Sequence, residues 1–310
     1  MRFLTRLVRE EKGSSLVIVM LAMVALLGSA AMVTDYGLLA AKRRALATAA
    51  DAAALAGAQE LVLNPGAGSQ ALEKAVEYAV LNGVEPEVVE AGLSHGGRAV
   101  TVTVRDNVQY SFARVLGFFT GDVSATATAL TGTVSALTGV VPLTIVEQDF
   151  VKGQEYHLKS FPAGELGPGN FGALALGGKG AANYKKNLSR GYQGQIKVGD
   201  ILETEPGNMS GPTRAGFLER VNRCQDNCTF ANFKPGCPLL VYIPVIKQPT
   251  GGGRQEVEVV GFAAFFLNKN HPPKQGNQSI IRGWFVDTIV TGQIDDNAAD
   301  YGVTAVNLIR

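Results

Sequence analysis

The stretch SSLVIVMLAMVALLGSAAMVT, residues 14–34, carries no charged side chain, and it decides how the rest of the chain is interpreted. Its length of roughly 20 residues is what a helix needs to cross the hydrocarbon core of a bilayer. Residues 35–61 contain no proline and many alanines, which favours continuation of the same helix beyond the membrane. The sequence therefore predicts a transmembrane helix that is prolonged into a stalk, over residues 14–63.

The charges around this helix predict its orientation. Residues 1–13 hold four basic and two acidic side chains, and the positive-inside rule keeps such a stub in the cytoplasm. Residues 42–44 are basic as well, and they weaken the asymmetry without reversing it. We expect a single-pass protein of the cell membrane with its C-terminal part outside the cytoplasm. A cleaved secretory signal with an apolar region over 16–27 is the alternative. Against it, the apolar run continues through residues 31–33 and so becomes longer than most signal regions, which span about 7–15 residues.

Composition excludes some functions. The 28 Lys and Arg residues nearly balance the 27 Asp and Glu residues, so the net charge of +1 gives no field that would attract nucleic acid. Charged residues make up only 18% of the chain, and there are 37 glycines. These values suit a membrane anchor followed by a turn-rich β domain better than a soluble enzyme.

Hydrophobic periodicity divides the part outside the membrane in two. A turn around Pro65 is followed by an amphipathic helix at 70–81, strands at 98–105 and 123–130, and a helical patch at 112–119. We interpret residues 64–135 as a small α/β module. Residues 136–310 contain short β-prone segments separated by glycine and proline, which predict a sandwich or barrel-like outer domain. The expected fold class is a membrane-anchored α+β protein. The strands expected in the outer domain cover 140–146, 155–159, 194–200, 239–246, 256–267 and 279–290.

One segment resembles a known family. The apolar run is followed by Asp35-Tyr36-Gly37 and by the string AADAAALAGA over 49–58. Together they resemble the N-terminal segment of TadG-like (TadE/TadG-like) proteins of bacterial tight-adherence (Tad) pilus assembly. The resemblance implies a single-pass membrane protein with an exported C-terminal part that takes part in building Flp-type pili, and it implies no chemistry. The residues that carry it are Gly13, Asp35, Gly37, Leu46, Ala49, Ala50, Asp51, Ala53, Ala54 and Gly57.

The chain departs from the related pilins at one position. Substrates of the prepilin peptidase resemble one another in having Glu at the fifth residue after the cleaved glycine, and here the fifth residue after Gly13 is Ile18. A membrane-retained accessory protein is therefore favoured over a filament subunit that polymerises through its helix.

Small residues in the stalk suggest a contact surface. Ala50, Ala53 and Gly57 recur at helical spacing, and small side chains let another helix approach closely. Other pilus-assembly or membrane proteins are thus expected as partners along this helix, besides the lipid bilayer, and a homo-oligomer stays open. A self-supporting alanine-rich stalk is the alternative. Asp35 is expected at the outer membrane interface, as a polar stop that ends the apolar run. Asp51 interrupts the series of small residues, and the sequence does not show whether it faces a partner or solvent.

The three cysteines lie close together in the sequence. Cys224, Cys228 and Cys237 can form one disulfide with one thiol left over, which is the simplest arrangement in an exported domain. A metal site is the alternative, but no fourth ligand lies nearby and the spacing differs from that of a zinc knuckle.

Motifs for catalysis are missing from the sequence. Gly-x-Ser-x-Gly is absent, and none of His95, His157 and His271 lies in a recognisable catalytic pattern. We therefore expect a non-enzymatic protein without cofactor or metal, which acts as an accessory or structural component of a Tad/Flp-type pilus or surface assembly system. The alternative is a surface-tethered hydrolase or ligand-binding domain.

Overall fold

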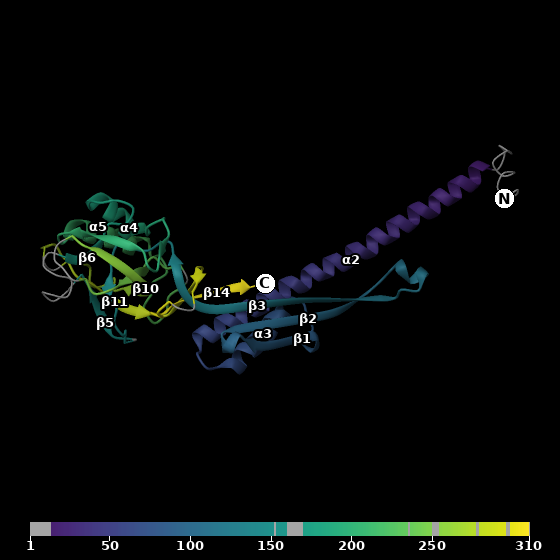
Figure 1. Cartoon of the computed structure of the whole chain (residues 1–310), viewed down its shortest axis with the longest axis horizontal. Helices are drawn as coiled ribbons and strands as arrows, with labels where there is room; N and C mark the ends of the chain where they lie inside the picture. Colours follow the sequence, from purple (N-terminus) through teal and green to yellow (C-terminus); the bar gives the residue numbers. More distant parts are fainter. Residues whose placement is uncertain are drawn as a thin grey trace. The chain divides into compact units, whose positions relative to one another are not determined.

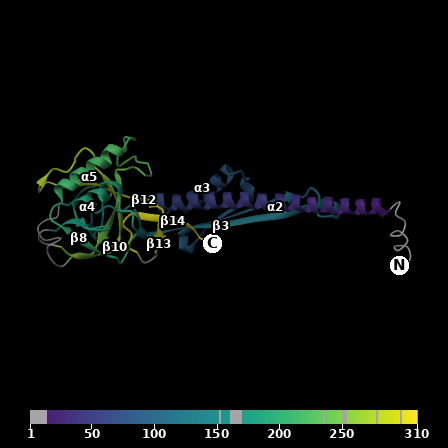
Figure 2. The same ribbon diagram turned by 90° about the horizontal axis from the view of Figure 1, so that it is seen from above.

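The computed structural model of this protein describes residues 14–151, 153–159, 170–234, 236–249, 254–276, 279–295 and 298–309. It has two compact units (Figures 1 and 2). Unit 1 comprises Met1–Ala129 and Leu308–Arg310, and unit 2 comprises Leu130–Asn307. The predicted stub 1–13, which includes Gly13, lies outside the described residues. The predicted stalk and the α/β module belong to the same unit, and the division falls at Ala129 rather than at residue 135.

Unit 1 is organised around α2 (Ser14–Leu63), which is one continuous helix of 50 residues. Of the helices in the described part of the chain, α2 is the one long and apolar enough to cross a membrane. Figure 1 shows α3, β1, β2 and the first part of β3 beside the C-terminal half of α2. The elements that follow α2 are α3 (Gly68–Leu81), η1 (Pro86–Val88), β1 (Val89–Ser94), η2 (His95–Gly97), β2 (Ala99–Gln109), η3 (Ala113–Leu116) and β3 (Thr120–Leu137).

The sheet of unit 1 has the order β1-β2-β3. β1 and β2 are antiparallel, with a register that runs from Val89 opposite Val104 to Ser94 opposite Ala99. Alternate residues of β2 are buried, as its apolar and polar alternation predicts. β3 begins in unit 1 and ends in unit 2, where it pairs with β7 and β13.

Unit 2 is mainly β. One sheet has the order β4-β9-β10-β11-β5, with β8 attached to β10 and β6 attached to β8. β12 pairs in parallel with β14. The strands of unit 2 are β4 (Ile145–Val146), β5 (Glu155–Leu158), β6 (Asn170–Leu174), β7 (Ile196–Lys197), β8 (Ile201–Pro206), β9 (Leu240–Ile246), β10 (Glu256–Leu267), β11 (Ile281–Val286), β12 (Thr288–Val290), β13 (Gln293–Ile294) and β14 (Val303–Ile309).

Two helices of unit 2 were not expected from the sequence. α4 (Ala181–Arg190) and α5 (Ser210–Arg223) pack against each other, with Tyr184, Leu188 and Phe217 buried. Both helices are short and mostly polar, so their few apolar residues give no clear helical period in the sequence. The predicted α+β class with a long N-terminal helix and a mainly-β outer part is confirmed. Over the residues that the structure describes, the sheets do not close into a barrel, and a sandwich is compatible with them.

Candidate functional site

The first family-motif residue with a defined role is Asp35, which directly follows the apolar run. Its side chain is only 5% exposed. Asp35 Oδ1 accepts a hydrogen bond from the backbone N–H of Ser111 at 2.8 Å, and Oδ2 accepts from Phe112 at 3.0 Å and from Ala113 at 2.6 Å. These donors lie at the start of η3, where backbone N–H groups have no partner within the helix. We call this arrangement the Asp35 clasp.

The Asp35 clasp holds the carboxyl in its charged form. Burial by itself raises the pKa of this carboxyl, and the three backbone N–H donors more than reverse that effect, so the pKa lies below its ordinary value. The sequence predicted only a polar stop at the membrane interface. The structure instead makes Asp35 a tie between α2 and the end of the β2–β3 hairpin, which is strengthened by an ion pair of 2.6 Å between Lys42 and Asp106.

The alanine-rich part of α2 is covered by its own chain. Its buried side, which we call the alanine face, packs against α3 and β2. On α3, Ala71, Ala75 and Ala79 recur every fourth residue and are completely buried. This corrects the predicted contact, because a partner protein has to reach α2 elsewhere. The alanine face consists of Leu46, Ala49, Ala50, Ala53, Ala54 and Ala58, each at most 1% exposed.

The two motif glycines of α2 differ in their surroundings. A Cβ on Gly57 would lie 2.8 Å from the backbone oxygen of Ala71 and 3.0 Å from Val100, so this glycine is what lets α3 approach so closely. A Cβ on Gly37 would meet nothing within 4 Å. Gly57 is therefore required by packing, whereas Gly37 lies on an open surface of α2.

Asp51 lies half-buried at the edge of the alanine face. Within the described part of the chain it makes no ion pair, whereas the Asp35 carboxylate accepts three backbone hydrogen bonds. The motif thus contains two acidic residues with different surroundings, and the structure assigns a contact to only one of them.

The three cysteines come together in unit 2. Cys224 follows α5 directly, and the three Sγ atoms lie within 4.8 Å of one another. The Sγ atoms of Cys224 and Cys237 are 3.9 Å apart. Burial raises the pKa of the Cys237 thiol to about 12, while a hydrogen bond from Cys237 lowers the pKa of Cys228. All three are free thiols in this structure. The cluster supplies three of the ligands that a thiophilic metal needs, and a small movement would equally bring two sulfurs to bonding distance.

We propose that two of the three thiols form the predicted disulfide when the domain is exported. A disulfide requires an S–S distance of about 2.05 Å, so Cys224 and Cys237, whose sulfurs are 3.9 Å apart, would move together by roughly 2 Å. Alkylation of the unfolded, unreduced full-length protein should then modify one cysteine, and alkylation after reduction should modify three. Three modified cysteines without reductant would contradict the bridge, and co-purified metal in that case would favour a three-thiolate site.

A buried lysine was missed by the sequence analysis. Lys159 is 4% exposed, and its ammonium group donates to the carbonyl of Asn208 and, at 2.8 Å, to Thr213 Oγ1. The Tyr184 hydroxyl lies 3.1 Å from the same Thr213 oxygen. Burial lowers the pKa of Lys159 to about 7. Thr213 and Tyr184 are buried as well, so these hydrogen bonds satisfy polar groups in the interior of unit 2.

A long helix with an apolar N-terminal half and a C-terminal half packed into its own domain is typical of a membrane-anchored class of protein. Residues 13–60 match the family model described as "Putative Flp pilus-assembly TadE/G-like". The match confirms the resemblance proposed from the residues, and it contains both the Asp35 side of the clasp and the alanine face. No curated protein matches the chain, and no solved structure does.

Proposed function

We propose that this protein is a membrane-anchored accessory or structural component of a Tad/Flp-type pilus or a related bacterial surface assembly. It acts through protein–protein contacts and catalyses no reaction. The observation that carries the proposal is the match of residues 13–60 to the pilus-assembly family. In this proposal the N-terminus is cytoplasmic, α2 crosses the membrane once, and both units lie outside the cytoplasm.

The geometry of unit 1 supports such a role. α2 runs from the apolar segment into the alanine face as one helix that contains no proline. The Asp35 clasp fixes the β2–β3 hairpin at the residue where the apolar run ends. Unit 1 is therefore held at a defined position relative to the membrane-spanning segment, which is what a component of a surface assembly needs.

A partner helix can reach α2 on its open side. Gly37, Ala41 and Ala45 follow one another at intervals of four residues, and all three are exposed. Small side chains at this spacing permit close helix–helix approach. We propose this side, rather than the alanine face, as the contact with other pilus-assembly proteins.

Site-specific photo-crosslinking in cells that assemble pili tests this function. A photoreactive residue at Ala41 is expected to give adducts with other pilus-assembly proteins, which mass spectrometry identifies. The matched control is Gln59, an exposed residue near the C-terminal end of the same helix. A photoreactive residue at this position should give no such adducts. If Ala41 gives no adducts with pilus proteins, the proposal fails. Adducts only with a second copy of the chain would indicate a homo-oligomer instead.

A further inference from the structure

We propose that the tip of the β2–β3 hairpin inserts its phenylalanines into the surface of the bilayer that α2 crosses. The hairpin tip comprises residues 110–119, between the end of β2 and the start of β3. The proposal rests on α2 being the membrane anchor, and it gives unit 1 a second contact with lipid. The occupant of this surface is lipid and not another protein.

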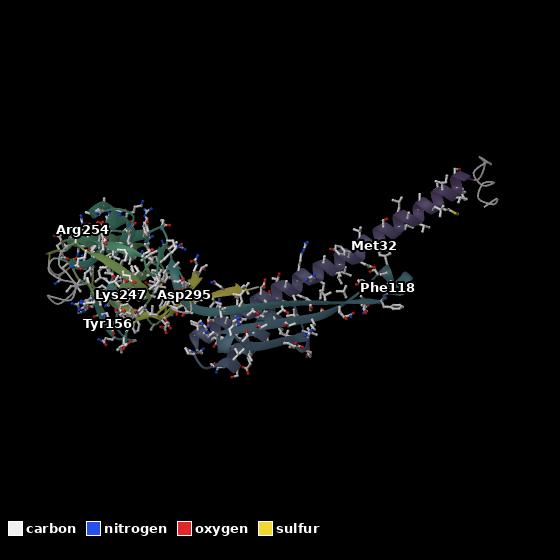
Figure 3. All side chains as sticks on the ribbon, viewed as in Figure 1. Met32, Phe118, Tyr156, Lys247, Arg254 and Asp295 are labelled. Atoms are coloured by element: carbon white, nitrogen blue, oxygen red, sulfur yellow. The ribbon has the colours of Figure 1, made fainter. Side chains whose placement is uncertain are left out.

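The position of the hairpin tip is fixed by hydrogen bonds. A bond of 3.0 Å from the Tyr110 N–H to the Phe119 carbonyl closes it at its base. The Asp35 clasp then joins the tip to the residue that directly follows the apolar run. A segment attached at that point lies at the membrane interface whenever residues 14–34 span the hydrocarbon core. Figure 3 shows Phe118 close to the apolar part of α2, near Met32.

The side chains of the hairpin tip suit that environment. Phe112, Phe118 and Phe119 are 49%, 64% and 62% exposed. Contiguous exposed apolar side chains mark interaction or membrane surfaces on proteins. Apolar surface also lies on both sides of Asp35 in α2, where the tip is bonded, since Met32, Val33 and Tyr36 are more than 70% exposed. This continuity with the membrane-spanning run is what identifies lipid as the occupant.

The charges around the hairpin tip agree with a bilayer surface. Arg114 is the one charged residue within 110–119, and it is exposed. Its guanidinium group can reach lipid phosphates while the adjacent aromatic rings lie deeper, as basic and aromatic residues do at membrane interfaces. The nearby acids are engaged, because Asp35 is in the clasp, Asp106 pairs with Lys42, and Asp122 accepts from Asn107.

Depth-dependent fluorescence quenching tests the proposal on the full-length protein. Phe118→Trp is reconstituted into vesicles of phosphatidylcholine and phosphatidylglycerol with or without brominated acyl chains. We expect a blue-shifted emission from the introduced tryptophan and a loss of that emission in brominated vesicles, relative to wild type with its single Trp284. Leu81→Trp, at an exposed position on α3, is the matched control and should not be quenched.

A second variant distinguishes a hairpin tip that does not insert into lipid from a helix α2 that does not span the bilayer. Leu27→Trp lies within the apolar run and should be quenched if α2 spans the bilayer. Quenching at position 27 without quenching at position 118 would overturn the proposal while leaving the anchor intact.

Proteolysis gives an independent readout. Trypsin cleavage after Arg114 should be slower in vesicles than in detergent, and Phe118→Glu combined with Phe119→Glu should restore it. Equal cleavage of the wild type in both media would contradict a lipid-covered tip. Protection in native membranes but not in pure lipid vesicles would point to a protein partner, which also overturns the proposal.

Discussion

Gly57→Val is expected to destabilise unit 1 by roughly 3 kcal/mol, the upper part of the range for overpacked interiors. Already the first side-chain atom would lie 2.8 Å from the Ala71 oxygen and 3.1 Å from the Ala75 side chain, so α2 and α3 have to separate. The contact at 2.8 Å is with backbone, which cannot rotate away as a flexible side chain can. Separation would expose Ala71, Ala75 and Ala79, which are now completely buried.

The matched control for this variant is Gly37→Val. It makes the same chemical change in the same helix, so the intrinsic gain in helix propensity is shared. Because nothing lies within 4 Å of a Cβ at Gly37, no loss of stability is expected there. Thermal unfolding of the full-length proteins in detergent, with hydrogen exchange of the α3 amides, measures the difference. Equal behaviour of the two variants would show that the close approach of α3 is not required.

Asp35→Ala is expected to release the hairpin tip from α2. Removing the carboxylate leaves the backbone N–H groups of Ser111, Phe112 and Ala113 without their acceptor. Their amide hydrogen exchange should rise strongly, while exchange in α3 stays unchanged. Asp35→Asn keeps one acceptor oxygen but loses the charge, so it should give a smaller effect. Hydrogen exchange with mass spectrometry on the protein in lipid nanodiscs measures both.

Acid should have the same effect as this substitution, but only at low pH. The folded-state pKa of Asp35 lies below its ordinary value, so the clasp contributes stability above that ordinary value and loses it as the pH falls through the lowered pKa. Asp51→Ala is the control, because Asp51 belongs to the same motif and helix and has no part in the clasp. An unchanged exchange rate at Ser111 in Asp35→Ala would refute the role assigned to the clasp.

Local signals in the sequence predicted several elements well. The helix expected at 70–81 is α3, and the alternating valines and threonines at 98–105 lie in β2. The strand expected at 123–130 is longer in the structure, since β3 reaches Leu137 through pairing with β7 and β13. β1 was not expected, because the alternating segment VEAGLS is short and contains Glu, Ala and Gly, which have low strand propensity; it becomes a strand by pairing with β2.

The sequence by itself determined the uncharged run of membrane-spanning length, the continuity of its helix and the family segment, since these depend on local composition and spacing. Only the tertiary structure decided what that helix contacts. Asp35 meets donors 76 to 78 residues later in the chain, and the alanine face is covered by α3 and β2. A helix of small residues looks the same from the sequence whether its own chain or a partner packs against it. The choice depends on long-range contacts, and the local pattern does not encode them.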